Sequence, residues 1–263
     1  MKDSFPKGFQ QSNRDWNPWT TILRIYMKDT KIQDIMIEDR GSFYGCDRET
    51  FFRKGTTFKH RESLDGKDIL YTTRLFDHTF ITTGCELISK LFPHGEMNLD
   101  GTKLKEQFPS LQYEMAYPHF FYRRDKIDIP NLPEGYEIVP ADPADHKLLQ
   151  QFLDGCTDED IEDALIDLDD PDEEIRLVFH KGKPVGYGAY RRWGKMMGDV
   201  GILIQKEHRM KGLGKAAVAA ATEACLNNDC LPFYRTSREN TGSQSIARNL
   251  GYNYEWETFE YRL

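Results

Sequence analysis

The stretch of this sequence with the clearest capacity for chemistry is a basic, glycine-containing loop between two apolar segments. Residues 200–204 are apolar and predict a strand, and the alanine-rich residues 215–225 predict a helix. The first N–H groups of a helix have no partner within the helix, and the helix dipole places partial positive charge there. Three basic side chains lie in the same stretch, those of Arg209, Lys211 and Lys215. Because Gly212 and Gly214 also let the backbone approach an anion closely, the pattern predicts a phosphate or pyrophosphate site.

Two other interpretations of this loop remain open. One is an ordinary strand-to-helix turn on the surface of an α/β protein. The other is a nucleotide-binding loop, but residues 212–218 match neither the Walker pattern G-x-x-x-x-G-K-S/T nor the dinucleotide pattern G-x-G-x-x-G. The sequence therefore favours an anion site of a different kind.

The composition limits the class of protein. With 263 residues, of which 39% are hydrophobic, the chain can form one large domain or two small ones. Its net charge of −8 disfavours nucleic acid or an anionic membrane as the main partner. No apolar run is long enough to cross a bilayer and the first residues lack an apolar signal core, so we expect a cytoplasmic protein. The five scattered cysteines form no C-x-x-C pair and fit reduced thiols.

The first half of the chain, residues 1–130, predicts a small α+β unit in which no pattern indicates a chemistry. Residues 19–27 and 31–38 suggest the two strands of a hairpin. Two short strands and two helices are predicted further along, at 68–74, 79–83, 84–92 and 98–108. Residues 39–64 show no clear period.

Prolines and a glycine within residues 125–136 indicate a linker, so we expect a second unit at residues 134–263. Its patterns predict the order strand, helix, helix, three strands, helix, strand, helix, strand. The predicted elements are 136–139, 143–153, a helix capped by Thr157, 174–180, 184–192, 197–204, 213–227, 231–236, 242–249 and 254–261.

That order, with R-x-x-G-x-G at 209–214 after its central strand, resembles the GNAT superfamily of acyl-CoA-dependent N-acetyltransferases, whose signature is Q/R-x-x-G-x-G/A. Two later segments, N-x-x-S at 240–243 and L-G-Y at 250–252, are similar to the family's closing N-x-x-A/S and L-G-F/Y patterns. The resemblance covers the C-terminal half only. It implies an α+β fold whose C-terminal part is a GNAT-like mixed sheet flanked by helices, beside a smaller N-terminal α+β domain.

The resemblance also implies acetyl-CoA as cosubstrate and assigns residues to it. The backbone of a strand that parts from its neighbour would pair with the pantetheine arm, at Ile202, Leu203 and Ile204. The loop that cradles the pyrophosphate would follow Arg209 and comprise Met210, Lys211, Gly212, Leu213, Gly214 and Lys215. Asn240 and Ser243 would contact the cofactor from the other side. Unpaired N–H groups at a strand end can bind an amide as they would an added strand.

One position departs from the family pattern. Many members carry a tyrosine seven residues after the Asn, where its hydroxyl protonates the leaving thiolate, and this position is Ala247 here. Tyr252, Tyr234 or Ser237 could take its place. A CoA thiolate is also a good enough leaving group to depart without an acid.

A general base is expected as well, because only a neutral amine attacks a thioester and a free alkylamine has a pKa of about 10. Asp199, just before the central strand, and Glu239, beside Asn240, are the nearest carboxylates. Each also fits a plain surface carboxylate. His180 and His208 are weaker candidates.

Acidic residues crowd residues 154–174, without a lysine or arginine among them. The run would attract a cationic amine, but a solvated helix face explains it as well. It lacks the glycine and the spacing of a calcium loop, and we expect no metal.

The resemblance to the GNAT superfamily implies an N-acetyltransferase that transfers an acetyl group from acetyl-CoA directly to a primary amine of a small molecule or peptide. The alternative is an acyl-CoA-binding sensor with little catalytic activity. We expect the N-terminal lobe to be non-catalytic and either to shape the acceptor site or to form a homodimer contact.

Overall fold

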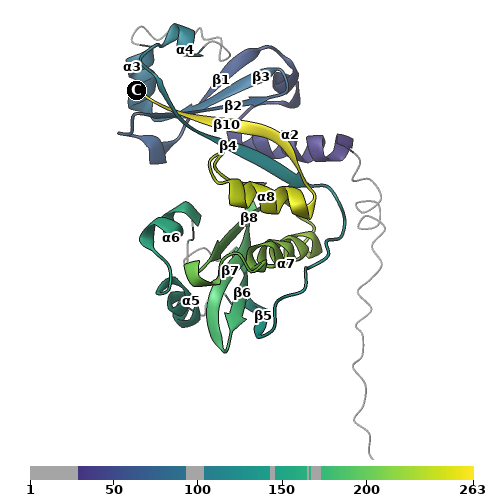
Figure 1. Cartoon of the computed structure of the whole chain (residues 1–263). Coiled ribbons are helices and arrows are strands. Elements are labelled where there is room, and N and C mark those ends of the chain that lie inside the picture. Colours follow the sequence, from purple (N-terminus) through teal and green to yellow (C-terminus); the bar gives the residue numbers. More distant parts are fainter. Residues whose placement is uncertain (1–28, 93–103, 143–145, 165, 167–172) are drawn as a thin grey trace, which may run out of the picture.

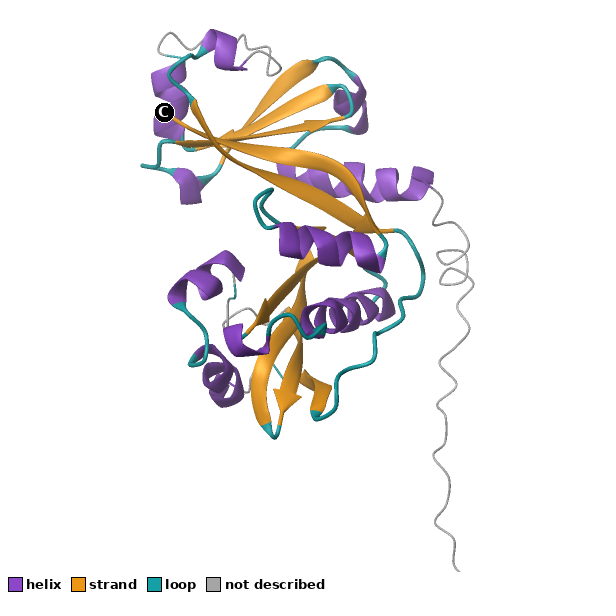
Figure 2. Cartoon of the chain, viewed as in Figure 1, coloured by secondary structure: helices purple, strands orange, loops and turns teal. Residues whose placement is uncertain are grey.

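Strands from both halves of the chain join in one mixed sheet with helices on both faces (Figures 1 and 2). The computed structural model describes residues 29–92, 104–142, 146–164, 166 and 173–263. The order of the strands across the sheet is β1-β3-β2-β10-β4-β9-β8-β7-β6-β5. The predicted fold class, α+β with a mixed sheet flanked by helices, is confirmed. No helix among the described residues has the length and apolar character needed to cross a membrane.

The elements before the linker are short. They are α2 (Asp29–Tyr44), the 3-10 helices η1 (Arg48–Phe52) and η2 (Glu62–Leu64), β1 (Gly55–His60), β2 (Ile69–Leu75), β3 (His78–Thr83), α3 (Cys85–Leu91), α4 (Leu104–Gln107) and β4 (Gln112–Tyr122). Strands β2 and β3 and helix α3 confirm three predictions. The strand predicted at 19–27 and the start of the helix predicted from residue 98 lie outside the described residues.

The elements after the linker follow the predicted order. They are β5 (Tyr136–Ala141), α5 (His146–Leu153), α6 (Asp158–Ala164), β6 (Glu173–His180), β7 (Lys183–Trp193), β8 (Met197–Ile204), η4 (Lys206–His208), α7 (Leu213–Asn227), β9 (Leu231–Arg235), α8 (Thr241–Leu250) and β10 (Tyr252–Arg262). Thr157 caps α6 as predicted, since its hydroxyl accepts a hydrogen bond from the Asp160 N–H at 3.1 Å.

The strand predicted at 31–38 is wrong, because these residues belong to helix α2. Ile32, Ile35 and Met36 have the i, i+3, i+4 spacing of one helix face, and all three are buried. They pack in a cluster with Phe121 and Trp256 of the sheet. Burial against strands distant in sequence therefore decides between two periodicities that the local residues allow.

Strand β4 was not predicted, yet it holds the two halves together. It lies between β9 and β10 and pairs antiparallel with both, although it precedes them by more than 100 residues in the chain. Strand β10 in turn pairs with β2 on its other edge. Strands from both sides of the predicted linker thus alternate in the sheet, and the division at residues 130 and 134 stays a prediction.

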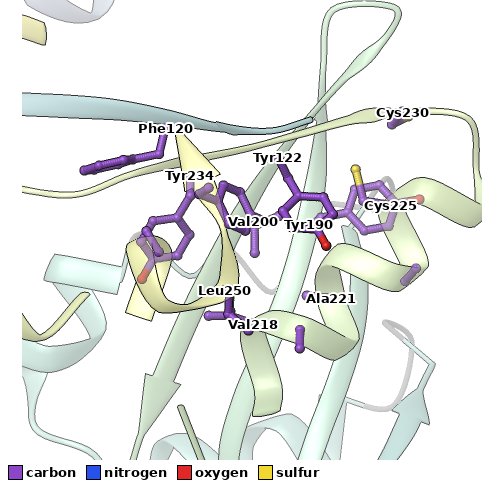
Figure 3. Close-up of a cluster of buried hydrophobic side chains, with 14 residues drawn as sticks. Phe120, Tyr122, Tyr190, Val200, Val218, Ala221, Cys225, Cys230, Tyr234 and Leu250 are labelled. Carbon is purple, nitrogen blue, oxygen red and sulfur yellow. The ribbon is translucent and has the colours of Figure 1, made fainter. Parts of the chain in front are cut away.

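The alanine-rich helix α7 packs closely on the sheet. Its residues Val218, Ala221 and Cys225 lie in a buried cluster with Tyr190 of β7 and Val200 of β8 (Figure 3). A Cβ atom on Gly188 of β7 would lie 2.7 Å from the Ala217 carbonyl oxygen of the helix. Small residues on both surfaces therefore fix the position of α7, and with it the loop that precedes it.

We predict that truncating a buried β4 side chain destabilises the whole protein. Phe121 is fully buried (0% exposed), so Phe121→Ala should lower the free energy of unfolding by about 3–5 kcal/mol. Chemical denaturation of the full chain measures this. Tyr113→Ala, in the same strand but at a side chain 41% exposed, is the matched control and should cost far less. Equal, small losses for both variants would show that β4 is not an integral strand.

Candidate functional site

The central feature of the C-terminal half is the separation of two parallel strands. Strand β8 pairs with β9 only at Met197, Gly198 and Asp199. Its pairing with β7 on the other edge continues to Ile204. On its other edge β9 pairs with β4, through Phe233 to Arg235, and this pairing continues after the pairing with β8 has ended. The backbone of β8 after Asp199 therefore has no strand partner on its β9 side, as predicted for Ile202, Leu203 and Ile204.

The loop after β8 delivers the backbone N–H groups of α7 at the end of this opening. Gly212 is the N-cap with a φ of 80°, a left-handed conformation that favours glycine, and no side chain caps the helix. Met210 also has a positive φ of 62°. The first helical hydrogen bond runs from the Ala216 N–H to the Gly212 carbonyl. The N–H groups of residues 213–215 precede that bond and remain available to an anion.

Gly214 brings three elements together at this point. A Cβ atom there would lie 3.0 Å from the Ile202 Cδ1 of β8 and 3.1 Å from the Ile246 Cδ1 of α8. The first turn of α7 therefore rests directly on the separated part of β8 and on α8. Ile202 and Ile246 also contact the buried cluster of Figure 3.

Arg209 has a structural role that the sequence did not indicate. Its Nε donates to the Ile204 carbonyl oxygen at 2.8 Å, and its guanidinium lies 2.7 Å from Asp160 of α6. The hydrogen bond from Arg209 lowers the pKa of the Asp160 carboxyl. Part of the predicted positive charge of the loop is thus neutralised, and the loop is joined to α6. Lys215, in the first turn of α7, is partly exposed.

Asn240 and Ser243 lie at the start of α8. The Asn240 side chain is the N-cap of this helix and accepts a hydrogen bond from the Ser243 N–H at 3.0 Å. Asn240 is exposed and Ser243 is partly exposed. Ile246, in the second turn of α8, lies against Gly214, so α8 packs beside the first turn of α7.

The two predicted base candidates differ in their surroundings. Asp199 is the last residue of β8 that pairs with β9, and its carboxylate accepts a hydrogen bond from Arg235 Nε at 3.0 Å. Its side chain is 21% exposed. Burial raises the pKa of the Asp199 carboxyl, while Arg235 acts in the opposite direction. Glu239 is exposed in the loop before α8.

Tyr252 is not brought to the opening. It is buried, and its hydroxyl shares a 2.5 Å hydrogen bond with Thr222, near the C-terminal half of α7. Burial raises the pKa of Tyr252 well above its ordinary value. Ala247 is also fully buried, so this position faces the core.

Tyr234 of β9 is better placed for a role as acid. Burial raises its pKa to about 12, and a hydrogen bond with the Ser243 side chain partly opposes that shift. Its hydroxyl points away from the end of the cluster that holds Tyr190 and Cys225 (Figure 3). Cys225 and Cys230 are buried within the same cluster.

The acidic run has mixed roles in its described parts. Asp158, Glu159 and Asp163 of α6 are exposed, whereas Asp160 pairs with Arg209. At the other end, Glu174 accepts hydrogen bonds from Tyr190 and Asn228. Residues 167–172 of the run lie outside the described residues.

Possible metal ligands gather elsewhere in the chain. His60, Asp65 and Cys85, all exposed, place one donor atom each within 4.8 Å of one another. His60 and Asp65 already form a contact of 2.9 Å, which is an ordinary surface interaction.

The comparison with known families agrees with this geometry. The sequence model of the Acetyltransferase (GNAT) family matches residues 141–252, which include β8, the loop, α7 and α8. The C-terminal half is a GNAT acetyltransferase domain. No curated protein matches the sequence.

Solved structures with a similar arrangement include three GCN5-related proteins of low identity. The N-acetyltransferase from Kribbella flavida is 18% identical, with a TM-score of 0.47, over 61% of this chain and 63% of that one. The N-acetyltransferase-like protein from Streptococcus suis 89/1591 is 17% identical, with a TM-score of 0.45, over 71% and 72%. The N-acetyltransferase from Sphaerobacter thermophilus is 15% identical, with a TM-score of 0.45, over 62% and 56%. The chain thus spans less than two thirds of the first and third of these proteins.

We predict that Arg209 stabilises the GNAT domain more than its ion pair alone would. Asp160→Ala should cost about 0–1 kcal/mol of unfolding free energy, because the pair is partly exposed. Arg209→Ala also removes the bond to the Ile204 carbonyl and should cost about 1–2 kcal/mol. Chemical denaturation of both single variants and the double variant measures the two contributions. Equal losses for the single variants would contradict this role.

Proposed function

We propose that this protein is an N-acetyltransferase that transfers an acetyl group from acetyl-CoA directly to a primary amine. The observation that carries the proposal is the unpaired edge of β8 beyond Asp199, which ends at the uncapped N-terminus of α7. A pantetheine arm carries amides that can pair with such an edge, and a pyrophosphate suits such a helix end. The GNAT domain supports acyl transfer as the class of reaction.

In this proposal the cofactor is held from two sides. The backbone of Ile202 to Ile204 pairs with the pantetheine arm and the thioester, and the N–H groups of residues 210–215 bind the pyrophosphate. Asn240 and Ser243, at the start of α8, contact the cofactor across the opening. The contact of Gly214 with Ile202 and Ile246 supports this arrangement, because it holds the three binding segments in one place.

Starting from the neutral amine, which a cationic acceptor forms by first losing a proton to solvent, the reaction requires one proton to leave the amine and one pair of electrons to leave with sulfur. The neutral amine nitrogen attacks the thioester carbon, the C–S bond breaks, and coenzyme A departs as the thiolate. Asp199 takes the amine proton, either directly or through a water molecule, and Tyr234 is the group that protonates the thiolate. Holding both reactants in one complex provides proximity, and backbone N–H groups polarise the thioester carbonyl.

The acceptor is proposed to be a cationic amine of a small molecule or peptide in the cytoplasm. Exposed carboxylates on α6 support this class. Arg209 joins α6 to the cofactor loop by pairing with Asp160. Among the described residues, Asp158, Glu159 and Asp163 form no ion pair. The net charge of −8 disfavours nucleic acid and anionic membranes as partners.

A second candidate function is acyl-CoA sensing with little catalysis. Two observations favour it: Ala247 occupies the position where many family members carry the acid, and Tyr252 is buried against Thr222. Release of free thiol from acetyl-CoA across a panel of amines distinguishes the two functions. Turnover above hydrolysis supports the enzyme, and tight binding without turnover supports the sensor.

We predict that a negative charge at Gly212 prevents cofactor binding. Gly212 has open space around its Cα and a left-handed φ, which Asp and Asn both tolerate better than most residues. Gly212→Asp should weaken acetyl-CoA binding at least tenfold, because a carboxylate repels the pyrophosphate. The isosteric and uncharged Gly212→Asn is the control, and should bind more tightly than Gly212→Asp. Calorimetry with acetyl-CoA tests this; unchanged affinity in Gly212→Asp would rule out the proposed pyrophosphate position.

We predict that the rate of acetyl transfer falls in acid as Asp199 becomes protonated. Burial raises the pKa of this carboxyl, so its basic form is populated only above that raised pKa, and activity should be lost as the pH falls through it. Asp199→Asn should lower kcat by about 10²-fold to 10⁴-fold. It should also remove the fall of the rate with pH that is due to this carboxyl. The exposed Glu239→Gln serves as the control. If Glu239→Gln abolishes activity while Asp199→Asn retains it, Glu239 and not Asp199 is the general base.

A further inference from the structure

Four aromatic and basic side chains gather beside the loop that leads into α7, and the cofactor binding described above uses only one of them. Tyr136 begins β5, His180 ends β6, and His208 and Lys211 belong to the loop. The His180 ring stacks on Tyr136, with centroids 4.4 Å apart and an interplanar angle of 18°. The His208 ring meets Tyr136 at an edge, with centroids 5.7 Å apart. We refer to these four residues as the Tyr136 cluster.

The phenol oxygen of Tyr136 holds the basic groups of the cluster in place. Lys211 Nζ donates to this oxygen at 3.1 Å and to the Glu207 carbonyl at 3.0 Å. His208 Nδ1 lies 2.9 Å from the same oxygen. Lys211 Nζ also lies 5.7 Å from the centre of the Tyr136 ring, within the range of a cation–π contact. An ammonium and an imidazole are therefore fixed close together by one hydroxyl group.

The Lys211 ammonium has no ion-pair partner among the described residues. Within the part of the chain that the structure describes, no carboxylate forms an ion pair with Lys211, His208 or His180. Burial lowers the pKa of His208, the nearby charge of Lys211 and the His180 ring lower it further, and the Glu207 carboxylate acts in the opposite direction. His208 is therefore held toward its neutral form beside the Lys211 ammonium, and an anion bound at Lys211 would favour the protonated imidazole.

The position of the cluster indicates which anion this is. Lys211 directly precedes Gly212, the N-cap of the helix end at which we place the pyrophosphate of coenzyme A. Besides that pyrophosphate, coenzyme A carries a phosphate on the 3′ carbon of its adenosine ribose, a few bonds away. We propose that Lys211, His208 and Tyr136 bind this 3′-phosphate, so that the protein selects coenzyme A over donors that lack it. This inference rests on the proposed function.

The chemistry of each group fits a phosphate monoester. The lysine ammonium provides a point charge with one donor left beyond its bonds to Tyr136 and Glu207. Once a bound phosphate has favoured protonation of His208, the imidazole and the phenol each provide one further directed donor. The Tyr136 hydroxyl positions both bases, and the stacked His180 ring holds the Tyr136 ring in its orientation. A thioester carried on a protein-bound phosphopantetheine has no 3′-phosphate and would lose these contacts.

The test compares coenzyme A with 3′-dephospho-coenzyme A by calorimetry on the full chain. The wild-type protein should bind coenzyme A at least about tenfold more tightly, which corresponds to about 1.4 kcal/mol. Lys211→Ala and His208→Gln should each weaken binding of coenzyme A and leave the affinity for the dephospho form unchanged. Lys206→Ala, which removes an exposed lysine from the same loop but outside the cluster, should keep the preference of the wild-type protein.

Three results would contradict the inference, and each has a separate meaning. Equal affinity of the wild-type protein for both ligands would exclude 3′-phosphate recognition and leave the proposed function intact. Equal weakening of both ligands in Lys211→Ala would place this lysine on the pyrophosphate instead. Binding of neither ligand to the folded wild-type protein would overturn the proposed function together with the inference.

Discussion

The separation of β8 from β9 beyond Asp199 is the constraint on which the rest of the site depends. In a closed sheet each backbone N–H and C=O of an inner strand has a partner. Here β8 keeps its β7 partner to Ile204 but loses its β9 partner after three residue pairs. The first turn of α7 lies at this point, where Gly214 contacts the side chains of Ile202 and Ile246. The geometry therefore provides both an edge of the kind that pairs with an extended amide chain and a helix end of the kind that suits an anion, as the proposed function requires.

The N-terminal half takes part in creating that opening. As β9 leaves β8 it pairs with β4, which lies between β9 and the last strand of the chain. The aromatic side chains of β4 contribute to clusters on both faces of the sheet: Phe120 packs with Tyr234 and Leu250, and Phe121 packs with Phe233 and α2. The path of β9, and hence the width of the opening, is set in part by a strand that precedes the GNAT domain in sequence.

Much of the C-terminal half could be predicted because its signals are local. The alternation of apolar and polar residues predicts the strands, and the glycine loop predicts where α7 begins. Thr157 likewise predicts the start of α6, which it caps. The N-terminal half was harder because its signals depend on distant partners. Residues 31–38 fit a strand or a helix until their burial against Phe121 and Trp256 is known. Strand β4 is an aromatic run whose two neighbours lie more than 100 residues away.

The same difference between local and distant contacts explains which features of the candidate site could be predicted from the sequence and which could not. The prediction of an anion-binding loop rests on the residues of the loop itself, and the prediction of Asp199 as a base rests on its place beside the central strand; both stay predictions. By contrast, the ion pair of Arg209 with Asp160 and the burial of Tyr252 against Thr222 join segments that no local pattern relates. The Tyr136 cluster likewise combines β5, the end of β6 and the loop.

Hydrogen–deuterium exchange of the full chain, with and without acetyl-CoA, tests the central claim most directly. If the cofactor occupies the opening, the amides of the β8 residues beyond Asp199 and of the first turn of α7 should exchange more slowly when it is bound. The amides of β8 residues 197–199, already paired with β9, should change little. Saturating acetyl-CoA that leaves exchange at Ile202 to Ile204 and at residues 213–215 unchanged would contradict the account.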